Sequence, residues 1–106
     1  MESETATLAS YDVAVDYGSL AAWDLGEEGT GYAVQLTGPM DERWVRSYYL
    51  LRIDSPGYSR FHLDTTSGIV WFACRRGDRP AKIVPVLEIL AALVASTNRR
   101  AASSVS

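Results

Sequence analysis

Alternation of apolar and polar residues dominates the first third of the chain. The apolar positions, spaced by two, are Tyr11, Val13, Val15 and Tyr17. This period predicts a half-buried strand with an acidic outer face. Gly18 indicates a bend or bulge, and residues 21–25 either continue this strand or begin a second one. The segment GEEGTG at 26–31 predicts a hairpin loop, which leads into a returning strand over residues 32–36.

The middle of the chain is dense in residue types that favour strands. Residues 43–53 are rich in Trp, Val, Tyr, Leu and Ile, and we interpret them as the longest strand. The Ser-Pro-Gly sequence at 55–57 predicts a tight turn, so residues 58–64 should return as its antiparallel partner. A second turn is expected at 65–68. The apolar run 69–75 then indicates a central strand covered on both faces.

The hydrophobic period changes after the break at residues 77–80. Apolar residues now recur at spacings of four, three and four, at Ile83, Leu87, Leu90 and Val94. This spacing predicts a C-terminal helix, with Asp78 as a candidate N-cap. Pro85 lies either in the first turn of this helix or at a kink within it.

These elements predict an α+β domain: a single antiparallel sheet of four to six strands, followed by one C-terminal α-helix packed on one face. We expect the domain to span residues 10–100, between disordered tails at 1–9 and 101–106. The order of elements is similar to that of the Whirly-type single-strand binders, a likeness in architecture alone.

Composition bears on the number of domains and on the expected cellular location. The chain has 106 residues, which is enough for one domain with one core. A single cysteine, Cys74, allows no disulfide within the chain, so we expect a cytoplasmic protein. The N-terminus lacks the features of a signal peptide. The longest apolar run, residues 83–95, is shorter than a membrane span and contains Pro85, so no membrane partner is expected.

Charge is divided unevenly along the sequence. Residues 1–31 hold seven acids and no base, whereas ten bases against six acids leave residues 32–106 at +4. The net charge of −3 argues against a general nucleic-acid binder. The division fits either two charged edges that keep the domain in solution, or a basic face with a binding role.

Arginines and aromatic residues gather in the middle segment and form the main candidate binding face: Trp44, Arg46, Tyr48, Arg52, Tyr58, Arg60 and His62. An open sheet that carries rings and guanidinium groups can hold single-stranded nucleic acid. The strand register decides whether the residues from 44–52 and those from 58–62 share one face of the sheet. With a regular turn the two groups lie on opposite faces, and with a bulge they lie on the same face.

Other candidate chemistry is sparse. Cys74 lies in an apolar strand, where we expect an inert, buried thiol. His62 and Asp64 could share a strand face as an acid/base pair, although nothing identifies a nucleophile. One histidine and one cysteine do not suffice for a usual zinc site, so no metal and no cofactor are expected. The glycine-rich loop at 26–31 precedes a strand rather than a helix, which argues against phosphate binding.

The predicted helix is apolar over about half of its circumference, which is wider than contact with one sheet requires. A homodimer would cover the surplus, with Val86, Leu90, Leu93 and Val94 as the candidate interface. A monomer with a deeply buried helix is the alternative. We therefore expect a small non-catalytic binding or regulatory module that acts on another protein, as a homodimer. Single-stranded nucleic-acid binding is the alternative, and a small enzyme that uses His62 and Asp64 is the third possibility.

Overall fold

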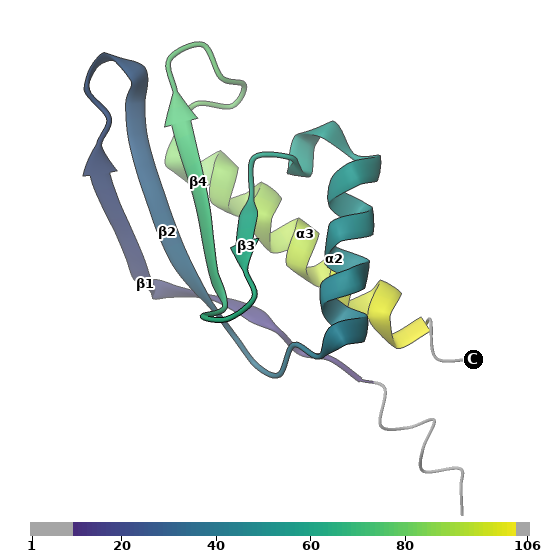
Figure 1. The fold of residues 1–106 in the computed structure, drawn as a ribbon. Helices are drawn as coiled ribbons and strands as arrows, with labels where there is room; N and C mark the ends of the chain where they lie inside the picture. The colour runs from purple at the N-terminus through teal and green to yellow at the C-terminus, as the bar shows by residue number, and fades with distance from the viewer. Residues whose placement is uncertain (1–9, 104–106) are drawn as a thin grey trace, which may run out of the picture.

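Four strands form one antiparallel sheet in the computed structural model, which describes residues 10–103. The elements are β1 (Ala14–Asp24), η1 (Gly26–Glu28), β2 (Gly29–Thr37), α2 (Glu42–Asp54), η2 (Pro56–Tyr58), β3 (His62–Asp64), β4 (Ile69–Arg75) and α3 (Ile83–Ser103). The strand order is β1-β2-β4-β3, and Figure 1 shows α3 behind the sheet with α2 beside it. The predicted α+β class, the antiparallel sheet and the C-terminal helix are confirmed, and α2 is an additional helix.

The β1–β2 hairpin contains the bulge that Gly18 indicated. The register of β1 against β2 shifts between Asp16 and Ala21. The Gly18 N–H donates to Oδ1 of Asp16 at 3.1 Å, and the Ser19 hydroxyl accepts the N–H of Gln35 at 2.7 Å. These bonds stabilise the extra residues without ending the ladder. The segment after the bulge therefore continues β1.

The predicted strand at 43–53 is wrong, because these residues form α2. The Asp41 carboxylate accepts the backbone N–H of Trp44 at 3.0 Å, which caps the first turn of the helix. Trp44 and Tyr48, four residues apart, are fully buried on one side of α2. Capping and this spacing prevail over the strand preference of the individual residue types. The predicted return strand at 58–64 shrinks to the three residues of β3.

The core lies on one face of the sheet. Alternate residues of the two central strands are buried there: Val34, Leu36, Val70, Phe72 and Cys74. The residues between them point to the opposite face, and Trp71 is 45% exposed. The prediction that residues 69–75 are covered on both faces is therefore wrong. β4 is a central strand of the sheet, but only one of its two faces is buried.

The wide apolar face of α3 contacts α2 as well as the sheet. The Trp44 indole N–H donates to Oδ1 of Asn98 at 2.7 Å, and Nδ2 of Asn98 donates to the carbonyl of Val13 at 3.0 Å. One side chain of α3 thus joins α2 to the segment that precedes β1. Because the sequence did not predict α2, it left this surplus apolar surface without a partner.

The residues of the expected dimer interface belong to the core of the monomer. Val86, Leu90, Leu93 and Val94 are each at most 3% exposed. They offer a second copy of this protein no surface, which corrects the expected interface. The alternative of a deeply buried helix describes their position.

The ends of α3 also differ from expectation. Pro85 is the third residue of the helix, where its missing N–H costs no helical hydrogen bond. Asp78 is not the N-cap, because it lies five residues before the helix and accepts the N–H of Arg75. α3 runs to Ser103 with Ala101 buried, so the first residues of the expected C-terminal tail are helical. The expected tail at 1–9 and residues 104–106 lie outside the described part.

Candidate functional site

The face of the sheet opposite the core, which we call the open face, carries two tryptophans. Trp23 on β1 faces Gly31 on β2, and Trp71 on β4 lies between Ala33 and His62 in the register. Their side chains are 39% and 45% exposed. The two rings meet edge to face, with centroids 5.6 Å apart and an interplanar angle of 62°. Trp23 lies over Gly31, which has no side chain, and Trp71 has the small Ala33 on its β2 side.

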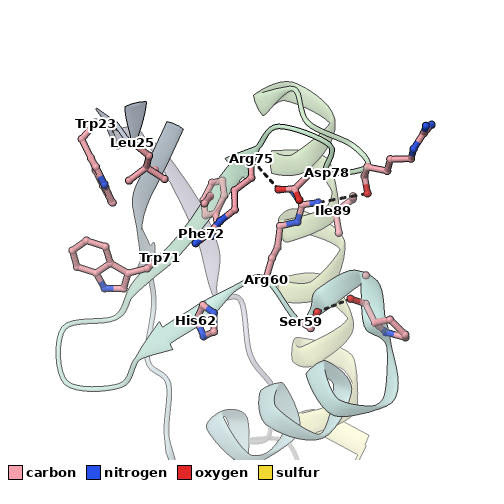
Figure 2. A pocket seen from close by; sticks show the side chains of 15 residues that line it. Trp23, Leu25, Ser59, Arg60, His62, Trp71, Phe72, Arg75, Asp78 and Ile89 are labelled. Carbon is pink, nitrogen blue, oxygen red and sulfur yellow. Dashed lines mark hydrogen bonds between the residues drawn. The ribbon is translucent and has the colours of Figure 1, made fainter. Parts of the chain in front are cut away.

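A cavity of about 570 Å³ opens beside these rings, along the edge of β4. We call it the edge pocket. Figure 2 shows Trp23 and Trp71 on one side of β4, with Arg60, Asp78 and Ile89 on the other. Its main side-chain lining is Trp23, Trp71, His62, Arg60, Arg75, Asp78 and Ile89.

The edge pocket exists because β3 is short. β3 pairs only with Ile69, Val70 and Trp71, although β4 continues to Arg75. Beyond His62 the backbone turns away from β4 into η2, whose Pro56 and Gly57 form the far wall of the pocket. The last four residues of β4 therefore have a strand neighbour on the β2 side alone.

Basic groups prevail around the edge pocket. Among the described lining residues, three arginines and His62 accompany one acid, Asp78. Nη2 of Arg60 reaches the carbonyl of Arg79 at 3.5 Å, whereas its Nη1 is buried and has no hydrogen-bond partner. A buried guanidinium nitrogen without an acceptor costs free energy, which an anionic ligand would recover.

The other charged groups of the pocket leave this Arg60 nitrogen unpaired. The Asp78 carboxylate accepts the backbone N–H of Arg75 at 2.7 Å. Arg75 itself forms an ion pair with Glu28 at 3.6 Å, and both side chains are well exposed. An exposed pair of this kind contributes little and can be exchanged for a ligand contact.

His62 and Asp64 share the open face, but no hydrogen bond joins them among the described residues. Nη2 of Arg52 lies 2.9 Å from Nδ1 of His62. Because the guanidinium can only donate, Nδ1 accepts and the imidazole proton is on Nε2. Asp64 accepts the N–H of Thr66 at 3.0 Å, and this bond lowers the pKa of its carboxyl. Each side chain is thus held by its own local contacts.

The structure divides the predicted binding face. Trp44 and Tyr48 are in the core, where burial raises the pKa of Tyr48 and its hydroxyl donates to the carbonyl of Phe61 at 2.8 Å. Arg46 is exposed on α2 and pairs with Glu42 at 3.3 Å. Arg52 bonds to the loop before β3, and Tyr58 packs partly buried in η2. Arg60 and His62 do come together, in the edge pocket.

Trp23 and Trp71 were not among the predicted site residues. No alternation marks Trp71 in the sequence, because its neighbours Val70 and Phe72 are also apolar. Trp23 follows the bulge, which interrupts the alternation before it.

The remaining candidates take structural positions. Cys74 points into the core at 7% exposure, and burial raises the pKa of its thiol. The loop at 26–31 forms the single 3-10 turn η1 and then enters β2 directly, so no α-helix begins there whose N-terminus could bind phosphate. Residues 10–103 contain no cluster of three or more His, Cys, Asp or Glu that could hold a metal ion. Within the same range, no helix is long and apolar enough to cross a membrane.

The open face and the edge pocket therefore form one continuous surface, with two half-exposed indole rings at one end and the Arg60 guanidinium, whose Nη1 is buried, at the other. A comparison of the sequence and fold with family models, curated proteins and solved structures finds no match.

Proposed function

We propose that this protein is a non-catalytic binding module whose partner is another protein, and that it binds through the open face and the edge pocket. One observation carries the proposal: two half-exposed tryptophans in mutual contact lie beside a pocket that holds a buried, unpaired guanidinium nitrogen. Tryptophan and arginine are the residues that contribute most to protein–protein binding. Exposed apolar rings in a polar rim are typical of interaction sites.

The local bonding of the titratable groups favours binding over catalysis. His62 is held by Arg52, Asp64 by its own turn, and the Cys74 thiol faces the core. A nucleophile and a base within hydrogen-bond reach of each other are the signature of nucleophilic catalysis. A cytoplasmic location, expected from the lone cysteine, belongs to the same proposal.

Self-association remains part of the proposal on a different surface. The α3 residues that suggested a homodimer are buried within one monomer, so we place a second copy at the open face instead. Single-stranded nucleic acid is the second candidate partner. The observation that favours it is the pair of exposed indoles next to Arg60 and Arg75, which could stack bases and contact phosphates.

Site-specific photocrosslinking in cells tests these alternatives. A benzophenone amino acid is placed at Ala21, which is exposed on the open face, and in a matched variant at Ala92, which is exposed on α3. We expect a discrete adduct from position 21 that position 92 does not give. Trp71→Ala should abolish the adduct, whereas Tyr17→Ala, another exposed aromatic of the sheet, should leave it.

The chemistry of the adduct identifies the partner class. An adduct that protease digests and nuclease leaves intact supports a protein partner, and a species of twice the 11.6 kDa monomer mass identifies a second copy. An adduct that nuclease removes would assign the face to nucleic acid. Identical adducts from both positions, or none, would contradict the proposal.

A further inference from the structure

The hydrogen bonds around β4 define which backbone groups face the edge pocket. In an antiparallel ladder the N–H and C=O of one residue point to one side, and those of the next residue point to the other. The Arg76 N–H donates to the carbonyl of Glu28, and the Leu36 N–H donates to the carbonyl of Gly68, so even-numbered residues face β2. The odd-numbered residues of β4 face away from β2.

Three odd-numbered residues succeed one another along this edge. Trp71 pairs with His62 of β3. Arg75 is closed off by Asp78, whose carboxylate accepts the Arg75 N–H and whose own N–H donates to the Arg75 carbonyl at 3.0 Å. Ala73 lies between them, and its N–H and C=O have no hydrogen-bond partner among the described residues. It lines the edge pocket.

The opposite edge of the sheet is protected against a further strand, whereas this gap is not. β1 has a bulge at 16–21 and the acids Asp16 and Asp24, which are features that discourage pairing with another strand. At Ala73 the gap is bounded by His62 on one side and the Asp78 turn on the other. Between these boundaries Ala73 presents one unpaired N–H and one unpaired C=O, which match the pair of backbone hydrogen bonds that one residue of an extended peptide forms.

The charge beside the gap specifies what such a peptide would carry. Arg60 extends along the same edge, close to Asp78 in Figure 2, and its Nη1 is buried without an acceptor. Basic side chains outnumber the acid around the pocket. A carboxylate is the group of a peptide that complements a guanidinium, with charge-assisted hydrogen bonds.

We propose that Ala73 is the docking point of an extended, carboxylate-bearing segment of the protein partner, which pairs with the Ala73 backbone and places its carboxylate on Arg60. This inference depends on the proposed function, because it names the chemistry of the partner at the same site. Strand addition to a sheet edge supplies affinity through backbone hydrogen bonds, and neighbouring pockets supply specificity. The carboxylate comes from an acidic side chain or from the C-terminus of the partner.

The probes are three mixtures of hexapeptides, studied with the isotope-labelled full-length protein by NMR. The first has Glu fixed at one position and blocked termini, the second has Gln there, and the third has Gln with a free C-terminal carboxylate. The readouts are the Ala73 amide and the indole N–H signals of Trp23 and Trp71. Trp44 is the internal control, because its indole N–H is bonded to Asn98 in the core.

We expect the Ala73 amide to exchange with solvent faster than those of Phe72 and Cys74 in the free protein, because its neighbours face β2. The Glu mixture should shift the Trp71 signal and slow the exchange at Ala73, and the Gln mixture with blocked termini should not. Binding of the third mixture would identify the C-terminal carboxylate as the recognised group.

Two variants test the contacts separately. Ala73→Pro removes the free N–H and should weaken binding about tenfold, since this residue contributes no N–H to the β2 ladder and proline is tolerated at such a position. Arg60→Gln should abolish the preference for Glu over Gln. Arg46→Gln, on the exposed surface of α2, is the matched control and should change nothing.

The outcomes separate this inference from the proposed function. Peptides that shift Trp71 while Ala73 remains unprotected would overturn strand pairing and leave the binding face intact. Equal binding of all three mixtures, or no binding of any of them, would overturn the inference, whatever the photocrosslinking gives. Displacement of both indole signals by a mixed-sequence single-stranded oligonucleotide, with the peptides inert, would overturn it in favour of nucleic acid. Both contacts are confirmed if the Glu mixture protects Ala73 more than the blocked Gln mixture does in the original protein, and if this difference disappears in Arg60→Gln.

Discussion

The indole ring of Trp23 covers the α-carbon of Gly31, its partner across the β1–β2 ladder. A β-carbon at Gly31 would lie 2.5 Å from Cε2 of Trp23, which is closer than any real contact. Gly31→Ala should therefore push the indole off the open face and break its contact with Trp71. We expect loss of the exciton signal of the indole pair in circular dichroism. The free energy of unfolding should change by about 1 kcal/mol or less, because the exposed ring can move aside.

Gly57→Ala is the control for this change. Gly57 also lines the edge pocket, but a β-carbon there has no atom within 4 Å. The exciton signal should persist in this variant. An unchanged signal in Gly31→Ala would show that the indole pair does not depend on the missing β-carbon.

Asn98 joins three separate segments, and Asn98→Ala should be strongly destabilising. The substitution leaves the Trp44 indole N–H and the Val13 carbonyl without their partners. Each unsatisfied buried group costs about 1–3 kcal/mol, so we expect a loss of about 2–4 kcal/mol in urea unfolding. Ser96→Ala, nearby on the same helix, should stay within about 0.5 kcal/mol. Equal midpoints for the two variants would contradict this role for Asn98.

Asp41 should make stability fall in acid. Its carboxylate caps α2 and accepts the Tyr11 hydroxyl at 2.8 Å, and the hydrogen bond from Trp44 is the main cause of its lowered pKa. A lowered pKa in the folded state gives stability that is present above the unfolded value, about 3.9, and is lost as the pH falls through the folded value. Asp41→Asn keeps a capping oxygen, so its unfolding should depend less on pH below about 4.

Asp41→Ala removes both cap and charge, and at neutral pH it should cost about 1 kcal/mol. Thermal unfolding of the two variants and the original protein, measured across acidic pH, separates the two effects. An equal acid dependence in Asp41→Asn would assign the loss of stability to other carboxylates.

Cys74 should react slowly with a thiol reagent in the folded protein and quickly in denaturant. Desolvation is the largest cause of its raised pKa, and the charge of Arg60 lowers that pKa without prevailing. The ratio of the two labelling rates measures the protection. Rapid labelling of the native protein would place the thiol at the surface and reopen the possibility of cysteine chemistry.

The sequence predicted the elements that show a clear pattern of apolar residues. Alternation and the glycine-rich loop identified the β1–β2 hairpin, a continuous apolar run identified β4, and the spacing from Ile83 to Val94 identified α3. The strand prediction for residues 43–53 was wrong because it used the strand preference of single residue types. The spacing between residues determined the helix instead: Asp41 lies three residues before Trp44, and Trp44 lies four residues before Tyr48. With α2 missed, the apolar surplus of α3 was assigned to a dimer.

The site was harder to predict because it depends on register and on where a strand ends. Arg60 and His62 were found from their residue types, but their neighbours in space, Trp23 and Trp71, lie on strands remote in sequence. The gap at Ala73 exists because β3 has only three residues, and no residue type in the sequence predicts where β3 ends. Pattern reasoning therefore recovered individual basic groups and not their arrangement.

If the gap beside the short β3 binds a partner segment, as we propose, the stability of the protein depends on that partner. A ligand that completes the β4 edge binds the folded state alone, and it therefore raises the free energy of unfolding in proportion to the logarithm of its concentration. Without that ligand, the Ala73 N–H and C=O have no hydrogen-bond partner among the described residues, and we expect the β4 edge to open locally more readily there. The lifetime of the protein in the cell would then follow the abundance of its partner, so that unbound copies are removed first.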